Sequence, residues 1–365
     1  MTPPASLTSL IRPLRLGKLW LSSNVVYSPL SGFSDYPFRQ IASRFQPGLI
    51  YCEMVRMEAL LKHRPSTYHL LDYHHTMRPI GAQIFGSSPQ CAGSAARIIE
   101  SLGFDTVDLN CGCPVNKVVR SQSGSKLLQQ PKLIGDILAN MAASVNIPVT
   151  VKIRAGWDLS SINSPLITSI AEQAGAQAIT IHGRTRTQKY KGPANWDYIK
   201  ACRSVAKKIK VFGNGDIFDA QAGIAMLQRT NCDGISVARG VIGQPWIAEE
   251  IRRKAEKQPP LHRSGFTLKQ SLLQHLDEIT SYYAHPAMAL ASLRRVANWY
   301  LKECSGAKTL RMAINHTLDI DIVRSMIEKY HWDQITYPLK SACATQLAQE
   351  AGEAKRKTLK GCIPK

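Results

Sequence analysis

The stretch 108–118, which reads Asp-Leu-Asn-Cys-Gly-Cys-Pro-Val-Asn-Lys-Val, holds residue types that could do chemistry. The apolar run ending at Leu109 is predicted to be a strand, which would fix its carboxyl end in space. Gly112 and Pro114 then force a turn, so the Cys113 side chain is expected to stand at a defined angle above that end. Cys113 is therefore predicted to be an exposed, positioned thiol.

The two cysteines of this stretch are predicted to differ. Asn110 and Lys117 flank Cys113 with an amide and an ammonium group, which favours a reactive thiol over an inert one. Cys111 is expected to be a small, space-filling core residue. The chain contains no Cys-x-x-Cys pair, so we expect no metal site.

Eight short apolar runs alternate with helical stretches between residues 24 and 257, and they would position this thiol. Strands buried on both faces read as continuous apolar runs, so eight such units predict an α/β fold, a (β/α)8 TIM barrel. A doubly wound sheet is the alternative, but no Gly-x-Gly-x-x-Gly follows the first run. The predicted strands are 25–28, 49–53, 80–85, 106–109, 149–153, 178–181, 209–212 and 234–237.

Residues at the carboxyl ends of barrel strands converge on one face, so polar residues there predict a shared ligand. Asn214-Gly215-Asp216 and Ala238-Arg239-Gly240 follow the last two strands, where such barrels bind phosphate through backbone N–H groups. A phosphorylated cofactor is therefore predicted. The residues that these ends present are Pro29, Gln83, Asn110, Lys152, His182, Asn214 and Arg239.

The chemistry of three of these residues favours a flavin. Lys152 lies within a strand, where a buried ammonium group needs an anion, and a reduced flavin carries one. Gln83 offers a donor and an acceptor to the edge of a ring. His182 could hold the cofactor, although a histidine satisfied within the core is an equal alternative.

The composition indicates a polyanionic partner. The 365 residues include 46 Lys and Arg against 26 Asp and Glu, a net charge of +20, which favours nucleic acid, although some proteins are simply basic. No apolar run is long enough to span a membrane and no signal peptide is evident at the N-terminus. Nine cysteines at irregular spacing indicate reduced thiols, so we expect a cytoplasmic protein.

After residue 257 the pattern becomes purely helical and defines a second region. The predicted organisation is a lead-in (1–23), the barrel (24–257), a small all-helical domain (258–335) and a basic tail (336–365). Residues 251–365 hold 19 Lys and Arg against 10 Asp and Glu, so we expect the helices to bind phosphates. The candidate contacts are Arg294, Arg295 and Lys302, with Trp299 and Tyr300 as stacking surfaces.

An ordered set of motifs makes the chain resemble the tRNA-dihydrouridine synthases, closest to their bacterial B-type branch. The resemblance runs from about Asn24 to Trp246, with a weaker match at 293–301. The motifs are the stretch 108–118 together with 28–39 (Ser-Pro-Leu-Ser-Gly-Phe-Ser-Asp-Tyr-Pro-Phe-Arg), 83–86 (Gln-Ile-Phe-Gly), 151–157 (Val-Lys-Ile-Arg-Ala-Gly-Trp), 181–186 (Ile-His-Gly-Arg-Thr-Arg), 213–216 (Gly-Asn-Gly-Asp) and 238–240 (Ala-Arg-Gly).

The resemblance implies an FMN enzyme that uses NADPH as its reductant and reduces uridines in tRNA to dihydrouridine. Cys113 would donate the proton, and Asn110, with Lys117 close by, would contact the uracil. The loop carrying Arg184 and Arg186 could extend the basic surface to the pocket rim. The implied FMN contacts are Pro29, Leu30, Ser31, Gln83, Lys152, His182, Asn214, Gly215, Asp216, Ala238 and Arg239.

Two other functions stay open from the sequence. An FMN barrel could instead reduce a free pyrimidine or an enone, although the net charge speaks against this. A non-catalytic RNA-binding protein on a barrel scaffold would bind no flavin. We expect a monomer in each case.

Overall fold

The structure, a computed structural model, describes residues 10–261, 263–302 and 304–334. The predicted basic tail and the first nine residues of the predicted lead-in lie outside the described residues. The rest of the lead-in, the predicted barrel and the predicted helical domain lie largely within them. Eight parallel strands close into a barrel in the order β10-β3-β4-β5-β6-β7-β8-β9, which confirms the predicted (β/α)8 TIM barrel.

Each predicted apolar run coincides with one strand of the barrel. The strands are β3 (Val25–Tyr27), β4 (Leu49–Arg56), β5 (Ile80–Phe85), β6 (Thr106–Cys111), β7 (Val149–Arg154), β8 (Ala178–His182), β9 (Lys210–Asn214) and β10 (Gly234–Val237). Side chains alternate between the two faces of a strand, and this alternation divides each run between the barrel interior and the helix layer.

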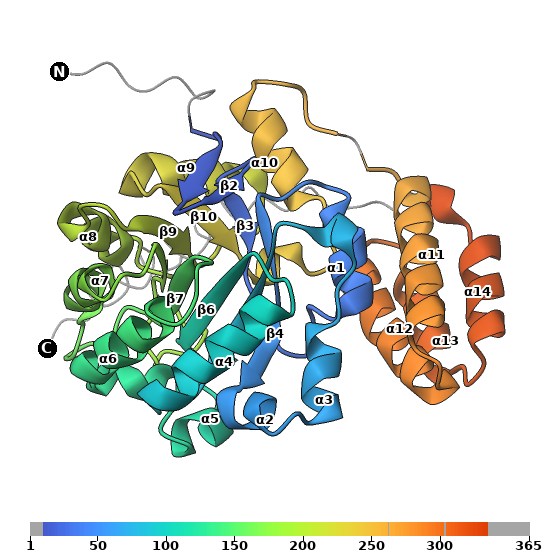
Figure 1. Ribbon diagram of the computed structural model, residues 1–365. Helices are drawn as coiled ribbons and strands as arrows, with labels where there is room; N and C mark the ends of the chain where they lie inside the picture. The colour runs from blue at the N-terminus through green and yellow to red at the C-terminus, as the bar shows by residue number, and fades with distance from the viewer. Residues whose placement is uncertain (1–9, 262, 303, 335–365) are drawn as a thin grey trace, which may run out of the picture.

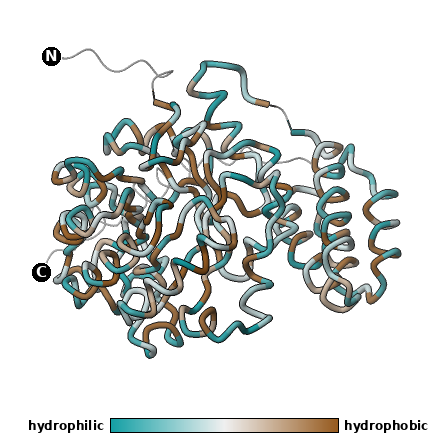
Figure 2. The backbone as a smooth tube through the Cα atoms, viewed as in Figure 1, coloured by the Kyte–Doolittle hydropathy of each residue, from teal (hydrophilic) through white to brown (hydrophobic). Residues whose placement is uncertain are grey.

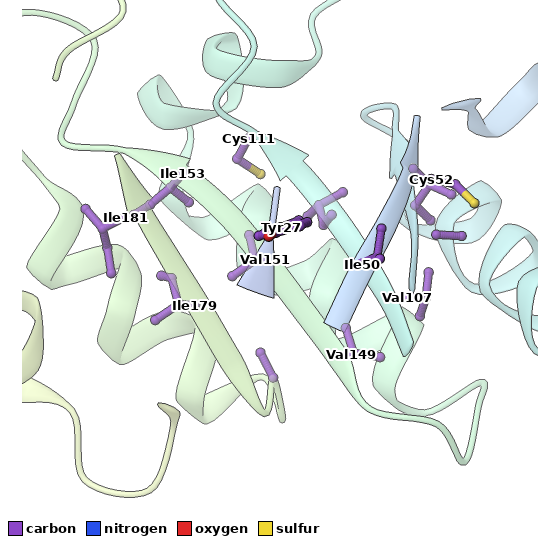
Figure 3. Packing of buried hydrophobic residues seen from close by; sticks show 14 of the residues in the cluster. Tyr27, Ile50, Cys52, Val107, Cys111, Val149, Val151, Ile153, Ile179 and Ile181 are labelled. Carbon is purple, nitrogen blue, oxygen red and sulfur yellow. The ribbon is translucent and has the colours of Figure 1, made fainter. Parts of the chain in front are cut away.

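The register of β6 and β7 makes this division visible. Val151 and Ile153 of β7 lie beside Ile179 and Ile181 of β8 and belong to the apolar layer beneath the helices (Figure 3). Thr150 and Lys152, which alternate with these residues, have the opposite orientation, and Thr150 donates to Asp108, its paired residue on the neighbouring strand β6. Polar side chains of the strands therefore gather inside the barrel.

Helices cover the outside of the barrel, and hydrophilic and hydrophobic residues alternate along them (Figure 2). Most begin at a Pro, Ser, Asn or Asp that suits a first turn, as the Asp219 carboxylate does by accepting from Ala222 N. They are α1 (Tyr36–Ser43), α2 (Met57–Leu61), α3 (Pro65–Tyr68), α4 (Pro89–Ser101), α5 (Asn116–Arg120), α6 (Pro131–Ala142), α7 (Ser164–Gln173), α8 (Asp197–Val205), α9 (Ala220–Thr230) and α10 (Ile247–Ala255), with short 3-10 turns between some of them.

The lead-in contributes a small hairpin, β1 (Leu14–Leu16) and β2 (Leu19–Leu21), which pair antiparallel. Leu14, Leu16 and Leu21 pack against the first residues of several barrel strands, including Leu49 and Ala178. The hairpin therefore covers the amino-terminal end of the barrel, opposite the end where parallel strands place functional residues.

Four further helices form a separate group beside α1, here called the helical module: α11 (Gly265–Tyr282), α12 (Pro286–Leu301), α13 (Lys308–His316) and α14 (Ile320–Lys329) (Figure 1). They share a core of their own that includes Leu272, Leu293 and Ile314. The chain between 308 and 329 forms two helices and not one, because Asp319 caps α14 by accepting from Asp321 N and Ile322 N.

The helical module is held to the barrel by polar and aromatic contacts. Arg295 of α12 donates to the Asp35 carboxylate at 2.7 Å, and Tyr283 donates to the same carboxylate at 3.1 Å. Trp299 stacks on Phe33, with ring centroids 5.2 Å apart. Since Asp35 and Phe33 belong to the loop after β3, the module rests directly on a loop at the carboxyl end of the barrel.

Candidate active site

A pocket of about 760 Å³ opens at the carboxyl ends of the strands. It contains every residue predicted to hold the cofactor, together with the candidate proton donor and two of the candidate substrate contacts. These lining residues are Pro29, Leu30, Ser31, Gln83, Asn110, Cys113, Lys117, Lys152, His182, Asn214, Gly215, Asp216, Ala238 and Arg239. Their positions agree with the sequence analysis, while their individual roles stay predictions.

Cys113 is held at the pocket by contacts on both sides of its loop. Asn110 Oδ1 accepts from the Gly112 and Cys113 backbone N–H groups at 3.1 and 2.9 Å. Arg154 Nε donates to the Gly112 carbonyl at 2.8 Å. Gly124, at φ +60°, packs so closely that an added Cβ would lie 2.9 Å from the Cys113 carbonyl oxygen. The thiol therefore sits on a firmly anchored turn.

The environment of Cys113 favours the protonated thiol. Partial burial raises its pKa, while the Val115 backbone and the charges of Arg154 and Lys152 act in the opposite direction. A thiol with a raised pKa carries its proton at neutral pH and can donate it. The two nearby cations would then stabilise the thiolate that remains.

Cys111 has the position expected of a structural residue. Its side chain is fully buried in the apolar layer with residues such as Leu109 and Ile153 (Figure 3). Side chains alternate along β6, so Cys111 points to the same side as Leu109. It therefore points away from the pocket side of the strand, where Asp108 and Asn110 lie.

Lys152 crosses the pocket floor to the strand β9. Its Nζ donates to Asn214 Oδ1 at 3.2 Å, and Asn214 Nδ2 donates to the Ser236 carbonyl at 2.6 Å. The pKa of Lys152 is lowered to about 8, mainly by burial and also by the charge of Arg154, while the charge of Asp108 acts in the opposite direction. An anion bound in this pocket would stabilise the ammonium form.

The loop after β9 has the backbone shape expected of a phosphate loop. Gly215 has φ +122°, and an added Cβ there would lie 2.7 Å from the Ala194 side chain. Asp216 has φ +57° and accepts from Arg184 at 2.8 and 2.6 Å and from Arg239 at 3.2 Å. The Asp216 carboxylate therefore serves to hold two arginines, which leaves backbone groups to face a ligand.

Arg184 corrects one expectation. Its side chain is buried, and its guanidinium group is engaged by Asp216 and by the Gly192 carbonyl. It therefore lies beneath the pocket wall and does not extend the exposed basic surface. His182 lies 3.3 Å from the same guanidinium, and burial lowers its pKa well below its usual value, so the imidazole is neutral at pH 7.

Two residues that the sequence analysis did not single out complete the site. Arg154 ties two loops together, because it bonds to Gly112 and also donates to the Thr185 and Lys189 carbonyls. Alternation would have found it, since it follows Lys152 by two residues on the same strand face. Tyr190 lines the pocket with its ring 4.4 Å from the Arg239 guanidinium, and no local pattern indicates this.

Cations from two segments of the chain lie near the Cys113 loop, and one of them, Lys117, lines the pocket. Arg186 lies over the Trp157 ring at 4.6 Å and donates to Asn116 Oδ1, while Lys126 approaches the other side of the cluster, 5.3 Å from the same ring. We call the following six residues the basic rim: Lys117, Arg120, Lys126, Arg186, Lys189 and Lys191. None of the six forms an ion pair within the part of the chain that the structure describes.

The candidate phosphate contacts of the helical module lie differently. Arg295 is paired with Asp35, and Arg294 donates to the Thr317 carbonyl. Tyr300 is 2% exposed, so the expectation that it offers a stacking surface is wrong. Lys302 is exposed and remains a candidate.

Two features are absent among the described residues. No group of three or more His, Cys, Asp or Glu could hold a metal ion there. None of the helices within that part is both long enough and apolar enough to cross a membrane.

Comparison with known proteins places the chain among relatives. A family model described as dihydrouridine synthase matches residues 26–329. A probable tRNA-dihydrouridine synthase of Rickettsia typhi is 35% identical over 321 residues, covering 87% of this chain and 97% of its own. The tRNA-dihydrouridine synthase B of Pasteurella multocida is 35% identical over 307 residues, covering 84% of this chain and 92% of its own.

Solved structures share the fold at low identity. A 2-naphthoyl-CoA reductase complex has a TM-score of 0.53 at 12% identity, covering 69% of this chain and 53% of that one. Morphinone reductase has a TM-score of 0.50 at 14% identity, covering 70% of this chain and 91% of that one. These two similarities concern the barrel fold alone.

Proposed function

The chain belongs to the dihydrouridine synthase family, and from this premise we propose that it reduces the C5=C6 bond of uridines in tRNA to 5,6-dihydrouridine. We propose FMN as its flavin and NADPH as its reductant. The observation that carries this proposal is an anchored, protonated thiol, Cys113, which shares one pocket with Lys152 and with two loops suited to phosphate.

The donors of the pocket fit FMN. The Lys152 ammonium donates to a neutral amide, that of Asn214, so an electron-rich ring edge would complete its surroundings. Gln83 and His182 would hold the ring edge, and Pro29, Leu30 and Ser31 would line it. Asn214, Gly215, Asp216, Ala238 and Arg239 would hold the phosphate, through backbone N–H groups and the Arg239 guanidinium.

The residues of the chain would supply the proton chemistry. FMN, when bound and reduced by NADPH, supplies the hydride for C6 of the uracil. Cys113 donates its proton to C5, and its thiolate is stabilised by the charges of Arg154 and Lys152. Asn110 and Lys117 line the pocket on the same side and are the proposed contacts of the uracil.

A uridine within folded RNA must leave its stack to reach Cys113, so the protein must hold the surrounding backbone while the base enters the pocket. The basic rim is suited to this because its cations come from the segments around the Cys113 loop and have no carboxylate partner among the residues that the structure describes. Arg186 and Lys117 of the rim are proposed substrate contacts, and Lys302 of the helical module is a further one.

The decisive test compares dihydrouridine in tRNA from cells with and without the protein, mapped by position. The proposal expects at least one position to lose dihydrouridine and to regain it when the protein is restored. An absorbance scan of the purified protein, with chromatography of any released pigment, tests FMN. If dihydrouridine in tRNA is unchanged and the protein reduces free pyrimidines or enones, the substrate is a small molecule and not tRNA.

A further inference from the structure

A chain of hydrogen bonds runs beneath the pocket from Asp108 to the Cys113 loop. Gln83 Nε2 donates to Asp108 Oδ2 at 2.7 Å, and Asn110 Nδ2 donates to Gln83 Oε1 at 2.7 Å. Asn110 Oδ1 then accepts from the Gly112 and Cys113 N–H groups. Asp108, Gln83 and Asn110 are all buried, so solvent does not readily replace these bonds.

The two ends of this chain have fixed and opposite hydrogen-bonding character. The Asp108 carboxylate can only accept, and the backbone N–H groups at the other end can only donate. The side-chain amides of Gln83 and Asn110 between them could each turn either way. Only one arrangement satisfies every group, in which both amides point their NH2 groups toward Asp108 and their oxygens toward Cys113.

Two side chains donate hydrogen bonds to the Asp108 carboxylate, one of them being Gln83. Thr150 Oγ1 donates to its second carboxylate oxygen at 2.6 Å. Burial raises the pKa of Asp108 to about 6, while the bonds from Gln83 and Thr150 and the charge of Lys152 act against this. Both carboxylate oxygens of Asp108 therefore act as acceptors inside the barrel.

We propose that Asp108 is a positioning residue that sets the direction of the Gln83 and Asn110 amides and so holds the Cys113 loop in place. Gln83 and Asn110 also line the pocket. Asp108 thereby determines where the pocket wall offers a donor and where it offers an acceptor. The inference rests on the proposed function only in giving Cys113 the role of proton donor.

A change of the amide at position 110 to a carboxylate should break the chain. In Asn110→Asp, carboxylates would face Gln83 from both ends, so the Gln83 oxygen would have to meet one of them. Adding Asp108→Asn should repair the chain, because the new amide at position 108 can donate to the Gln83 oxygen. The Gln83 amide would then turn over and donate to the carboxylate at position 110. Asp108→Asn alone should have a small effect, because an amide oxygen there can still accept from Gln83.

The measurement is the alkylation rate of Cys113 by iodoacetamide in the full-length protein, followed by mass spectrometry of the Cys113 peptide from pH 6 to 10. We expect the high-pH plateau rate to rise about tenfold in Asn110→Asp, because repulsion from the Gln83 oxygen would displace the new carboxylate from the Gly112 and Cys113 N–H groups. The double variant should return to within about threefold of the parent. Thr150→Ser, which removes a buried methyl beside Asp108 but keeps the hydroxyl, should match the parent.

The proposal is overturned by a parental rate in Asn110→Asp, or by a double variant that stays as reactive as Asn110→Asp. If Asn110→Asp does not fold, recovery of the folded protein by Asp108→Asn supports the proposal, and failure to recover it overturns the proposal. An equal rise in Thr150→Ser would indicate general loosening of the barrel interior and also overturn it. No tRNA or NADPH is present, so this outcome is separate from that of the proposed reaction.

Discussion

The basic rim of the barrel and the helical module both carry lysines and arginines, but their charges have different surroundings. Segments 112–130 and 183–196 contain seven Lys and Arg and no Asp or Glu. Residues 258–335 contain nine Lys and Arg against seven Asp and Glu, a net charge of +2. The excess that the sequence analysis attributed to the helices therefore lies largely outside that region.

The pairing of individual side chains sharpens the difference. In the helical module, Arg295 and Arg324 each meet a carboxylate, and Arg263, just before α11, meets Glu249. The six cations of the basic rim have no such partner among the described residues. A cation already paired with a carboxylate neutralises a phosphate less effectively, so total charge does not locate an RNA surface, whereas unpaired charge does.

The largest expected effect separates chemistry at the barrel mouth from binding elsewhere. Cys113→Ala should retain flavin and tRNA but lose dihydrouridine formation by roughly 10²-fold or more, the usual contribution of a positioned acid. Cys111→Ala is the matched control and should stay close to the parent, because that thiol lies in the helix layer. Equal activity in all three proteins would mean that Cys113 is not the proton donor.

The next effect tests the basic rim directly. Replacing Lys117, Lys126 and Arg186 with Ala should weaken tRNA binding and flatten the slope of log K against log salt. Each lost contact should contribute about 0.9 in duplex regions or about 0.7 on single strands. Affinity measured at several salt concentrations gives the slope. Anaerobic reduction of the flavin by NADPH should be unchanged, and an unaltered slope would remove the rim from the RNA surface.

A smaller effect is expected from the matching change in the helical module. Replacing Arg294, Arg295 and Lys302 with Ala should alter the salt slope by about one contact at most, that of Lys302. The same protein should unfold at a lower temperature, since Asp35 loses its partner inside the contact with the barrel. A slope change as large as that of the rim variant would restore the helices as the main phosphate surface.

The smallest effect concerns the stability of the helical module at low pH. His275 is fully buried, its Nε2 has no hydrogen-bond partner among the described residues, and burial lowers its pKa to about 4. The unfolded chain binds a proton near pH 6.5 and the folded protein near 4, so stability falls as pH decreases through this window.

Replacing His275 with Leu should remove that part of the pH dependence, which amounts to roughly 3 kcal/mol across the window. Chemical denaturation of parent and variant at pH 7 and pH 4.5 measures it. The difference in unfolding free energy between the two pH values should be smaller in the variant. The same pH dependence in both proteins would show that another group is responsible.

Much of the barrel could be predicted because each strand is buried on both faces and therefore reads as an apolar run. The two loops after β9 and β10 were predictable for a related reason, since glycines mark where backbone must turn or approach a ligand. The split between α13 and α14 was harder to predict. It depends on a cap at Asp319 within a sequence that otherwise keeps its helical spacing.

The sequence by itself determined the order of the strands, the residues at their carboxyl ends and the contrast between Cys111 and Cys113, because these follow from local pattern and alternation. Only the tertiary structure decided which charged side chains form ion pairs. Arg295 meets Asp35 across 260 residues, and Arg184 meets Asp216 across 32. Such pairings depend on how the closed barrel brings distant loops together, and no local pattern encodes that proximity.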